Sequence, residues 1–150
     1  MPSTSAGKMR DLEKAKRILK ERNQSLVIVK EGRIIFCLDS SGIDGILQAI
    51  EKKREDLCGA SIADKVVGKA AALLFAYSHV ARVYASILSR RGLKTLREHK
   101  IPVEYDLVVP EIMNKERTDT CPFEKFVSEI ESPSHAFEEL KAYVENLKMK

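Results

Sequence analysis

The pattern of apolar and polar positions divides the first third of the chain into a helix, a hairpin and a second helix. Apolar residues at helical spacing among charged ones predict helices over 9–22 and 43–57. Between them, two β-branched runs over 25–30 and 33–38 are joined by a Glu-Gly pair. Such a pair predicts a two-residue β-turn whose glycine accepts a positive φ.

The most apolar stretch of the chain is 64–78, with the sequence DKVVGKAAALLFAYS. Read as a helix, it carries apolar side chains on every face, which predicts a central helix buried all round. Its polar residues Asp64, Lys65 and Lys69 then sit in or near the first turn, where free backbone N–H groups and the helix dipole favour anions. We therefore expect any chemistry at this end of the helix.

The second half of the chain alternates between extended and helical patterns. The expected elements are a buried strand over 79–88, a short helix over 93–100, a strand over 103–109, a charged loop over 111–120, and helices opening at Pro122 and Pro133. Strands separated by helices predict an α/β protein with a mixed sheet of about four strands and helices on both faces, a three-layer α/β/α arrangement.

Composition narrows the class of protein. The 150 residues, 44% hydrophobic and 32% charged, predict a single globular domain over 9–150 after a disordered segment over 1–8. No apolar run approaches the roughly 20 residues of a membrane span, and the start has no secretory signal. Three widely spaced cysteines predict reduced thiols and a cytoplasmic location. A net charge of +4 is small for a dedicated nucleic-acid binder and argues against that class.

Two strings carry a family resemblance: DKVVGKAAALL over 64–74 and TCPFEK over 120–125. Together with the order of elements, they resemble a small family of bacterial proteins of unknown function within the cytidine-deaminase-like superfamily. The resemblance implies a cytidine-deaminase-like fold after Met9. It carries no established activity for the family itself.

Active deaminases of that superfamily bind zinc through a His-x-Glu or Cys-x-Glu pair at the start of the central helix and a Pro-Cys-x-x-Cys motif at the next one. This chain reads Val67-Gly68-Lys69-Ala70 at the first place and Ser89-Arg90-Arg91-Gly92-Leu93 at the second. Neither stretch supplies thiolate, imidazole or carboxylate ligands. We therefore expect no metal, no cofactor and no zinc-dependent deamination, with a remodelled pocket in place of the metal site.

Asp64, Lys65, Gly68 and Lys69 form the candidate ligand-binding site. The two lysines are one helical turn apart in this interpretation and point the same way; the alternative is an ordinary solvated face. A glycine inside a helix costs about 1 kcal/mol relative to alanine, so close approach by a ligand or packing against the sheet would explain Gly68. Asp64 is either part of the site or a plain N-cap.

Cys121 and Glu124 are the candidate catalytic residues. With Pro122 as first helical residue, Cys121 becomes the N-cap and Glu124 falls at the third position, as in a capping box. A helix N-terminus favours the thiolate form of cysteine, which is the nucleophilic one; the alternative is a structural cap. Arg90 and Arg91 follow a strand, at the edge where α/β proteins bind ligands, or are surface charges.

Three functions stay open. The first is an uncharacterised domain that binds a small anionic ligand, nucleotide-like or phosphorylated, in a zinc-free pocket bordered by Asp64, Lys65, Gly68 and Lys69, which Cys121 and Glu124 also approach. The second is a metal-independent enzyme that uses Cys121 in group transfer. The third is a structural oligomerisation protein. Self-association is expected because relatives by fold are commonly oligomers and because the first helix has an apolar face with no obvious internal partner.

Overall fold

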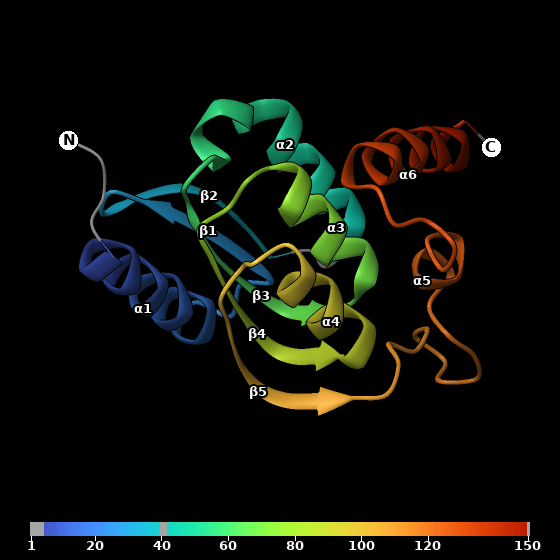
Figure 1. Ribbon diagram of the computed structural model, residues 1–150, viewed down its shortest axis with the longest axis horizontal. Coiled ribbons are helices and arrows are strands. Elements are labelled where there is room, and N and C mark those ends of the chain that lie inside the picture. The colour runs from blue at the N-terminus through green and yellow to red at the C-terminus, as the bar shows by residue number, and fades with distance from the viewer. Residues whose placement is uncertain (1–4, 40–41, 150) are drawn as a thin grey trace.

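The computed structural model describes residues 5–39 and 42–149. A five-stranded mixed sheet with the order β2-β1-β3-β4-β5 lies at its centre (Figure 1). The elements are α1 (Ser5–Glu21), β1 (Leu26–Lys30), β2 (Arg33–Leu38), α2 (Ile43–Leu57), β3 (Ser61–Val67), α3 (Lys69–Tyr77), β4 (Arg82–Ser89), α4 (Arg90–Glu98), β5 (Val103–Val109), α5 (Pro122–Phe126) and α6 (Pro133–Lys148). The α/β class predicted from the sequence is confirmed.

The hairpin forms the antiparallel half of the sheet. β1 pairs antiparallel with β2 on one side and with β3 on the other. Glu31 and Gly32 connect β1 to β2 with φ values of 51° and 79°, the pair of left-handed residues that a tight hairpin turn requires. β3, β4 and β5 form the parallel half, with α3 and α4 as the crossover helices.

The predicted central helix is wrong at its start. Residues 64–67 belong to β3, and α3 begins only at Lys69. Gly68 separates the two with an extended backbone, φ −112° and ψ −165°. The sheet gains a fifth strand because this segment pairs on both sides, with β1 and β4, and these pairings override its helical pattern. Lys65 and Lys69 therefore lie on different elements, and the interpretation that they share a helix face is wrong.

The two faces of the sheet are covered differently. α1 packs on one face, where Leu12, Ala15, Ile18 and Leu19 meet Val27, Val29, Ala63 and Tyr84. Alternate residues of the same strands, among them Ile28 and Ile62, join the larger core formed with α2, α3 and α4, and α6 packs against α3 (Figure 1). The apolar face of the first helix therefore has an internal partner, and this face no longer supports the predicted self-association.

The boundaries at the ends of the chain differ slightly from expectation. α1 begins at Ser5, ahead of the predicted start at Met9, so only residues 1–4 of the expected N-terminal segment lie outside the described residues. α3 is buried from Lys69 to Ala76, and only its last residue, Tyr77, is half-buried, as expected for a central helix. Among the described residues, none of the helices combines the length and apolar character that crossing a bilayer needs.

Candidate functional site

The N-terminus of α3 is capped by a carboxylate from a distant part of the chain. The backbone N–H of Lys69 donates to Glu124 Oε1 at 2.7 Å, and that of Ala70 donates to Glu124 Oε2 at 2.9 Å. Glu124 is on α5 and is only 9% exposed. The first N–H groups of a helix favour an anion. Here the protein supplies that anion itself.

Gly68 is required by this contact. A Cβ added at Gly68 would lie 2.1 Å from Oε1 of Glu124 and 2.4 Å from its Cδ. The sequence left close approach by a ligand or packing against the sheet as explanations for Gly68; the close neighbour is a side chain. A Cβ at Gly92 on α4 would in turn lie 3.0 Å from the carbonyl carbon of Gly68. The two glycines therefore let the starts of α3 and α4 and the carboxylate of Glu124 meet at one place.

Lys69 lies at the same place, but its charge is already compensated. Its Nζ donates to the carbonyl of Ser128 at 3.0 Å and pairs with Glu131 Oε1 at 2.8 Å. The side chain is 7% exposed. The ammonium of Lys69 holds the pKa of Glu131 below its usual range, mainly through this hydrogen bond. An incoming anion would therefore have to compete with Glu131 for Lys69.

Lys65 and Asp64 lie on β3, apart from this cluster. Lys65 is near the end of α1, where its Nζ donates to Asn23 Oδ1 at 3.0 Å. Asp64 sits in register with Leu26 of β1 and Ala85 of β4, so it is not an N-cap. Its side chain is 8% exposed, and its Oδ1 accepts a hydrogen bond from the backbone N–H of Val66 at 3.4 Å. Burial raises the pKa of Asp64 to about 7, against the smaller lowering effect of backbone hydrogen bonds.

Cys121 is the N-cap of α5, without a side-chain capping bond. The predicted capping box is not formed, because the Glu124 carboxylate turns away to α3. Among the described residues, the Cys121 thiol has no hydrogen-bond partner, and so no general base is in contact with it. Cys121 is half-buried beside Thr120, which lines the same cavity as Glu124.

Two hollows lie side by side at this edge of the sheet, where β3, β4 and β5 end. One, of about 230 Å³, is lined by Ser89, Arg91, Pro110, Glu111, Ile112, Thr120, Glu124, Lys125 and Ser128. The other, of about 420 Å³, is lined by Lys69, Arg91, Lys94, Thr95, Glu98, Ser128, Glu129 and Glu131. Arg91 and Ser128 border both. Within the described chain, the guanidinium of Arg91 forms no salt bridge.

Sequence reasoning missed Ser128 and Glu131, the partners of Lys69. They lie 59 and 62 positions away along the chain, and no local motif connects them to the start of α3. Glu124 was singled out, but for a role at its own helix. A carboxylate placed three residues after an N-cap gives no sign that it bonds to another helix.

The donor atoms at the start of α3 do not fit zinc. Both oxygens of Glu124 accept backbone N–H groups, and the nearby Lys69 contributes an ammonium group bound to Ser128 and Glu131, which is not a metal ligand. Zinc requires several thiolate, imidazole or carboxylate donors that converge at about 2 Å. In the described part of the chain, no three His, Cys, Asp or Glu residues are grouped in a way that could hold a metal ion.

Comparison with known proteins identifies a family and one close structural relative. The family described as "Domain of unknown function (DUF1893)" matches residues 14–144. The crystal structure of a DUF1893 family protein from Thermotoga maritima is similar over 95% of both chains, with 26% sequence identity and a TM-score of 0.85. The expected membership of a family of unknown function is thus confirmed. No curated protein matches the chain.

Deaminase-related structures match only in part. RibD of Acinetobacter baumannii covers 67% of this chain and 35% of its own length, with 17% identity and a TM-score of 0.49. The dCMP deaminase of the cyanophage S-TIM5, solved with dCMP and dUMP, covers 68% of this chain and 98% of its own, with 16% identity and a TM-score of 0.45. Likenesses of this size carry no conclusion about activity.

Proposed function

The chain belongs to the DUF1893 family, whose function is unknown, and we propose that it binds a small ligand with an anionic group, nucleotide-like or phosphorylated, in a zinc-free pocket. The observation that carries the proposal is the position of Arg91. Its guanidinium borders both hollows at the edge where β3, β4 and β5 end, and within the described residues it has no salt bridge. In α/β proteins this is the edge at which ligands bind.

The surrounding groups suit a polar ligand. Arg91 offers a planar donor for a phosphate or carboxylate. Glu124, fixed on α3 by two backbone N–H groups, keeps acceptor positions free for hydrogen-bond donors of the ligand. The hollow of about 230 Å³ is smaller than the usual 300–1,000 Å³ of ligand pockets, so part of the ligand would extend into the adjoining hollow of about 420 Å³. Lys69, which the sequence singled out as the anion contact, serves here as an internal partner of Glu131.

A thermal-shift panel of nucleoside monophosphates, nucleobases and sugar phosphates tests the proposal. A ligand at a hundredfold excess over its dissociation constant stabilises the protein by about 2.7 kcal/mol. We expect at least one phosphorylated compound to raise the melting temperature, and Arg91→Gln to abolish the shift. Arg90→Gln is the matched control, because Arg90 is exposed and borders neither hollow. Equal shifts in both variants, or no shift with any compound, would refute the proposal.

The absence of zinc chemistry stays a prediction with its own test. The sequence holds its cysteines at 37, 58 and 121 and its histidines at 79, 99 and 135, so it has no Cys-x-x-Cys or His-x-Glu spacing anywhere. We expect elemental analysis of protein purified without chelator to give far less than one zinc per chain. A stoichiometric amount would restore the deaminase interpretation.

The two other functions gain no support. Group transfer by Cys121 lacks a base in contact with the thiol within the described residues. Self-association stays a prediction, but α1 no longer supports it because the sheet covers its apolar face. Sedimentation at micromolar concentration tests it, and a single monomeric species would remove it.

A further inference from the structure

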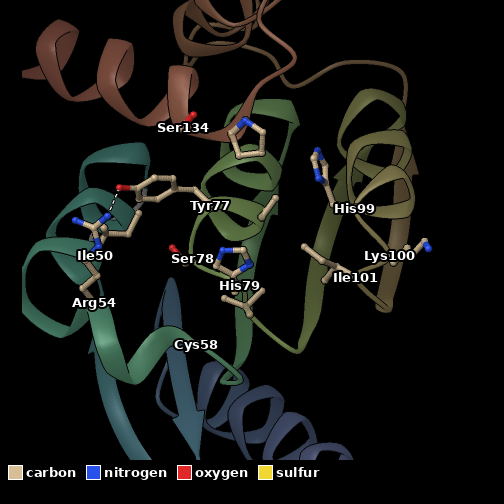
Figure 2. A pocket seen from close by; sticks show the side chains of 13 residues that line it. Ile50, Arg54, Cys58, Tyr77, Ser78, His79, His99, Lys100, Ile101 and Ser134 are labelled. Carbon is tan, nitrogen blue, oxygen red and sulfur yellow. Dashed lines mark hydrogen bonds between the residues drawn. The ribbon is translucent and has the colours of Figure 1, made fainter.

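A cavity of about 820 Å³ lies at the opposite edge of the sheet, where β3, β4 and β5 begin. It is lined by Ile50, Arg54, Cys58, Ala76, Tyr77, Ser78, His79, Val80, His99, Lys100, Ile101, Pro133 and Ser134. Figure 2 shows Arg54 and Tyr77 on one side, Ser78 and His79 in the middle, and His99 on the other side. Its volume falls in the range of small-molecule sites, about 300–1,000 Å³.

Basic side chains line this cavity without carboxylates. Arg54, His79, His99 and Lys100 are at its wall, and no Asp or Glu of the described residues is. None of the four forms a salt bridge within the described residues. The guanidinium of Arg54 donates to the hydroxyl of Tyr77 and lies 5.2 Å from the centre of its ring (Figure 2). Both contacts leave the positive charge of Arg54 without a carboxylate partner in the part of the chain that the structure describes.

Two of these residues also adopt a backbone conformation that favours glycine. His79 has a φ of 57° and Lys100 a φ of 58°. Each is the left-handed residue that ends a helix, α3 or α4, in a Schellman motif: Val80 N–H bonds to the carbonyl of Phe75 at 3.3 Å, and Ile101 N–H to that of Leu96 at 2.9 Å. Glycine is the usual residue at this position because a Cβ is strained there. Both helices thus end in a strained basic residue at the wall of one cavity.

We propose that this cavity is a binding site for a small phosphate monoester that carries an apolar or planar group. Arg54 would contact the phosphate together with His79, which lies in the middle of the cavity, since the two are donors from different elements without carboxylate partners within the described residues. The apolar part would pack on Tyr77, Val80 and Ile101. This site is separate from the one at Arg91 and goes beyond the proposed function.

The plain structural alternative is that these basic residues only stabilise the C-terminal ends of α3 and α4, where the helix dipole favours positive charge. The two interpretations differ for His79→Gly. Under both, glycine relieves the left-handed strain, which by itself raises the melting temperature by about 2–4 °C for a chain of this size; under the structural alternative the lost interaction with the helix dipole offsets this gain. Only a binding role predicts that the same variant loses affinity for phosphate esters.

The test is calorimetric titration of the full chain with phenyl phosphate, inorganic phosphate and phenol at constant ionic strength. We expect phenyl phosphate to bind most tightly and phenol not to bind. Arg54→Gln should weaken phenyl phosphate binding about tenfold or more, as expected for a lost charge-assisted hydrogen bond. His79→Gly should weaken it severalfold while raising the melting temperature.

Arg22→Gln is the matched control, because it removes the same charge from an exposed position at the end of α1. Unchanged binding in Arg54→Gln, an equal loss in Arg22→Gln, or phenol binding as tightly as its phosphate would overturn the inference. A loss in Arg91→Gln but not in Arg54→Gln would also overturn it, while supporting the proposed function at the other edge. If only Arg54→Gln loses affinity for phenyl phosphate, this inference is supported. The proposed site at Arg91 is then tested separately by its thermal-shift panel.

Discussion

The regions around Glu124 and Asp64 each bury a carboxyl group to nearly the same extent, since the two residues are 9% and 8% exposed. The two carboxyl groups nevertheless have different hydrogen-bond partners and opposite expected effects on stability. Glu124 accepts two short hydrogen bonds from the start of α3, and both helix and carboxylate gain from the pairing. Asp64 lies inside the sheet, where its hydrogen-bond donors are backbone N–H groups next to it in the chain, and its burial raises its pKa to about 7. The difference teaches that the partners of a buried carboxyl, and not its exposed fraction, decide whether it stabilises the fold.

Removing the Glu124 carboxylate should produce the largest effect. Glu124→Ala leaves the backbone N–H groups of Lys69 and Ala70 without their acceptor, and we expect a loss of about 3–5 kcal/mol in the free energy of unfolding, measured by urea denaturation. Glu129→Ala is the control, since Glu129 is exposed and close by in the chain. A loss no larger than that of the control would mean that water caps α3 equally well.

Neutralising Asp64 should raise the free energy of unfolding, whereas removing the Glu124 carboxylate lowers it. Because its pKa is raised in the folded protein from 3.8 to about 7, the native state holds a proton that the unfolded chain releases between these pH values. Stability from this group is therefore complete at low pH, falls as pH rises from about 4 to about 7, and stays low above that. Asp64→Asn should be more stable than wild type by about 1–4 kcal/mol at pH 8.

Urea denaturation at pH 5 and pH 8 measures the free energy of unfolding of both proteins. The difference between Asp64→Asn and wild type should be larger at pH 8. Asp56→Asn, at an exposed position of α2, is the control with the same charge change. If Asp64→Asn were less stable than wild type at pH 8, Asp64 would have a favourable partner as Glu124 does, and the comparison would fail.

Gly68→Ala should have an intermediate effect that depends on Glu124. The added methyl group would lie 2.1 Å from Oε1 and force the carboxylate off the helix, which we expect to cost about 1–3 kcal/mol. In the Glu124→Ala background the same change should be almost neutral, because the neighbour is gone. A double-mutant cycle measures this coupling. Simple additivity would show that Gly68 is needed for another reason.

Lys69→Met should have the smallest effect. Its ammonium pairs with Glu131, whose side chain is 72% exposed and returns to water when the lysine is lost. Methionine keeps much of the buried length of the side chain, so we expect a change within about 1 kcal/mol. A loss comparable to that of Glu124→Ala, in the same denaturation assay, would make Lys69 an equal member of the cap.

The sequence by itself determined the elements whose pattern is local. Three elements have the predicted bounds: the second hairpin strand Arg33–Leu38, the helix Ile43–Leu57 and the strand Val103–Val109. Their periodicity and their flanking turns depend only on residues close together in the sequence. The segment from Ser61 to Val67 has no such signal: a strand buried on both faces and a helix buried all round show the same apolar run. Only its pairing with β1 and β4 made it a strand.

The candidate site was decided almost entirely by tertiary structure. Gly68, Lys69 and Glu124 could be singled out as residues, but the bond that joins them spans 55 positions and follows from where α5 packs on the start of α3. The basic cavity at the other edge unites side chains from α2 and the ends of α3 and α4 in the same way. Sequence patterns record which face of an element is apolar, and they do not record which distant element comes to lie against its end.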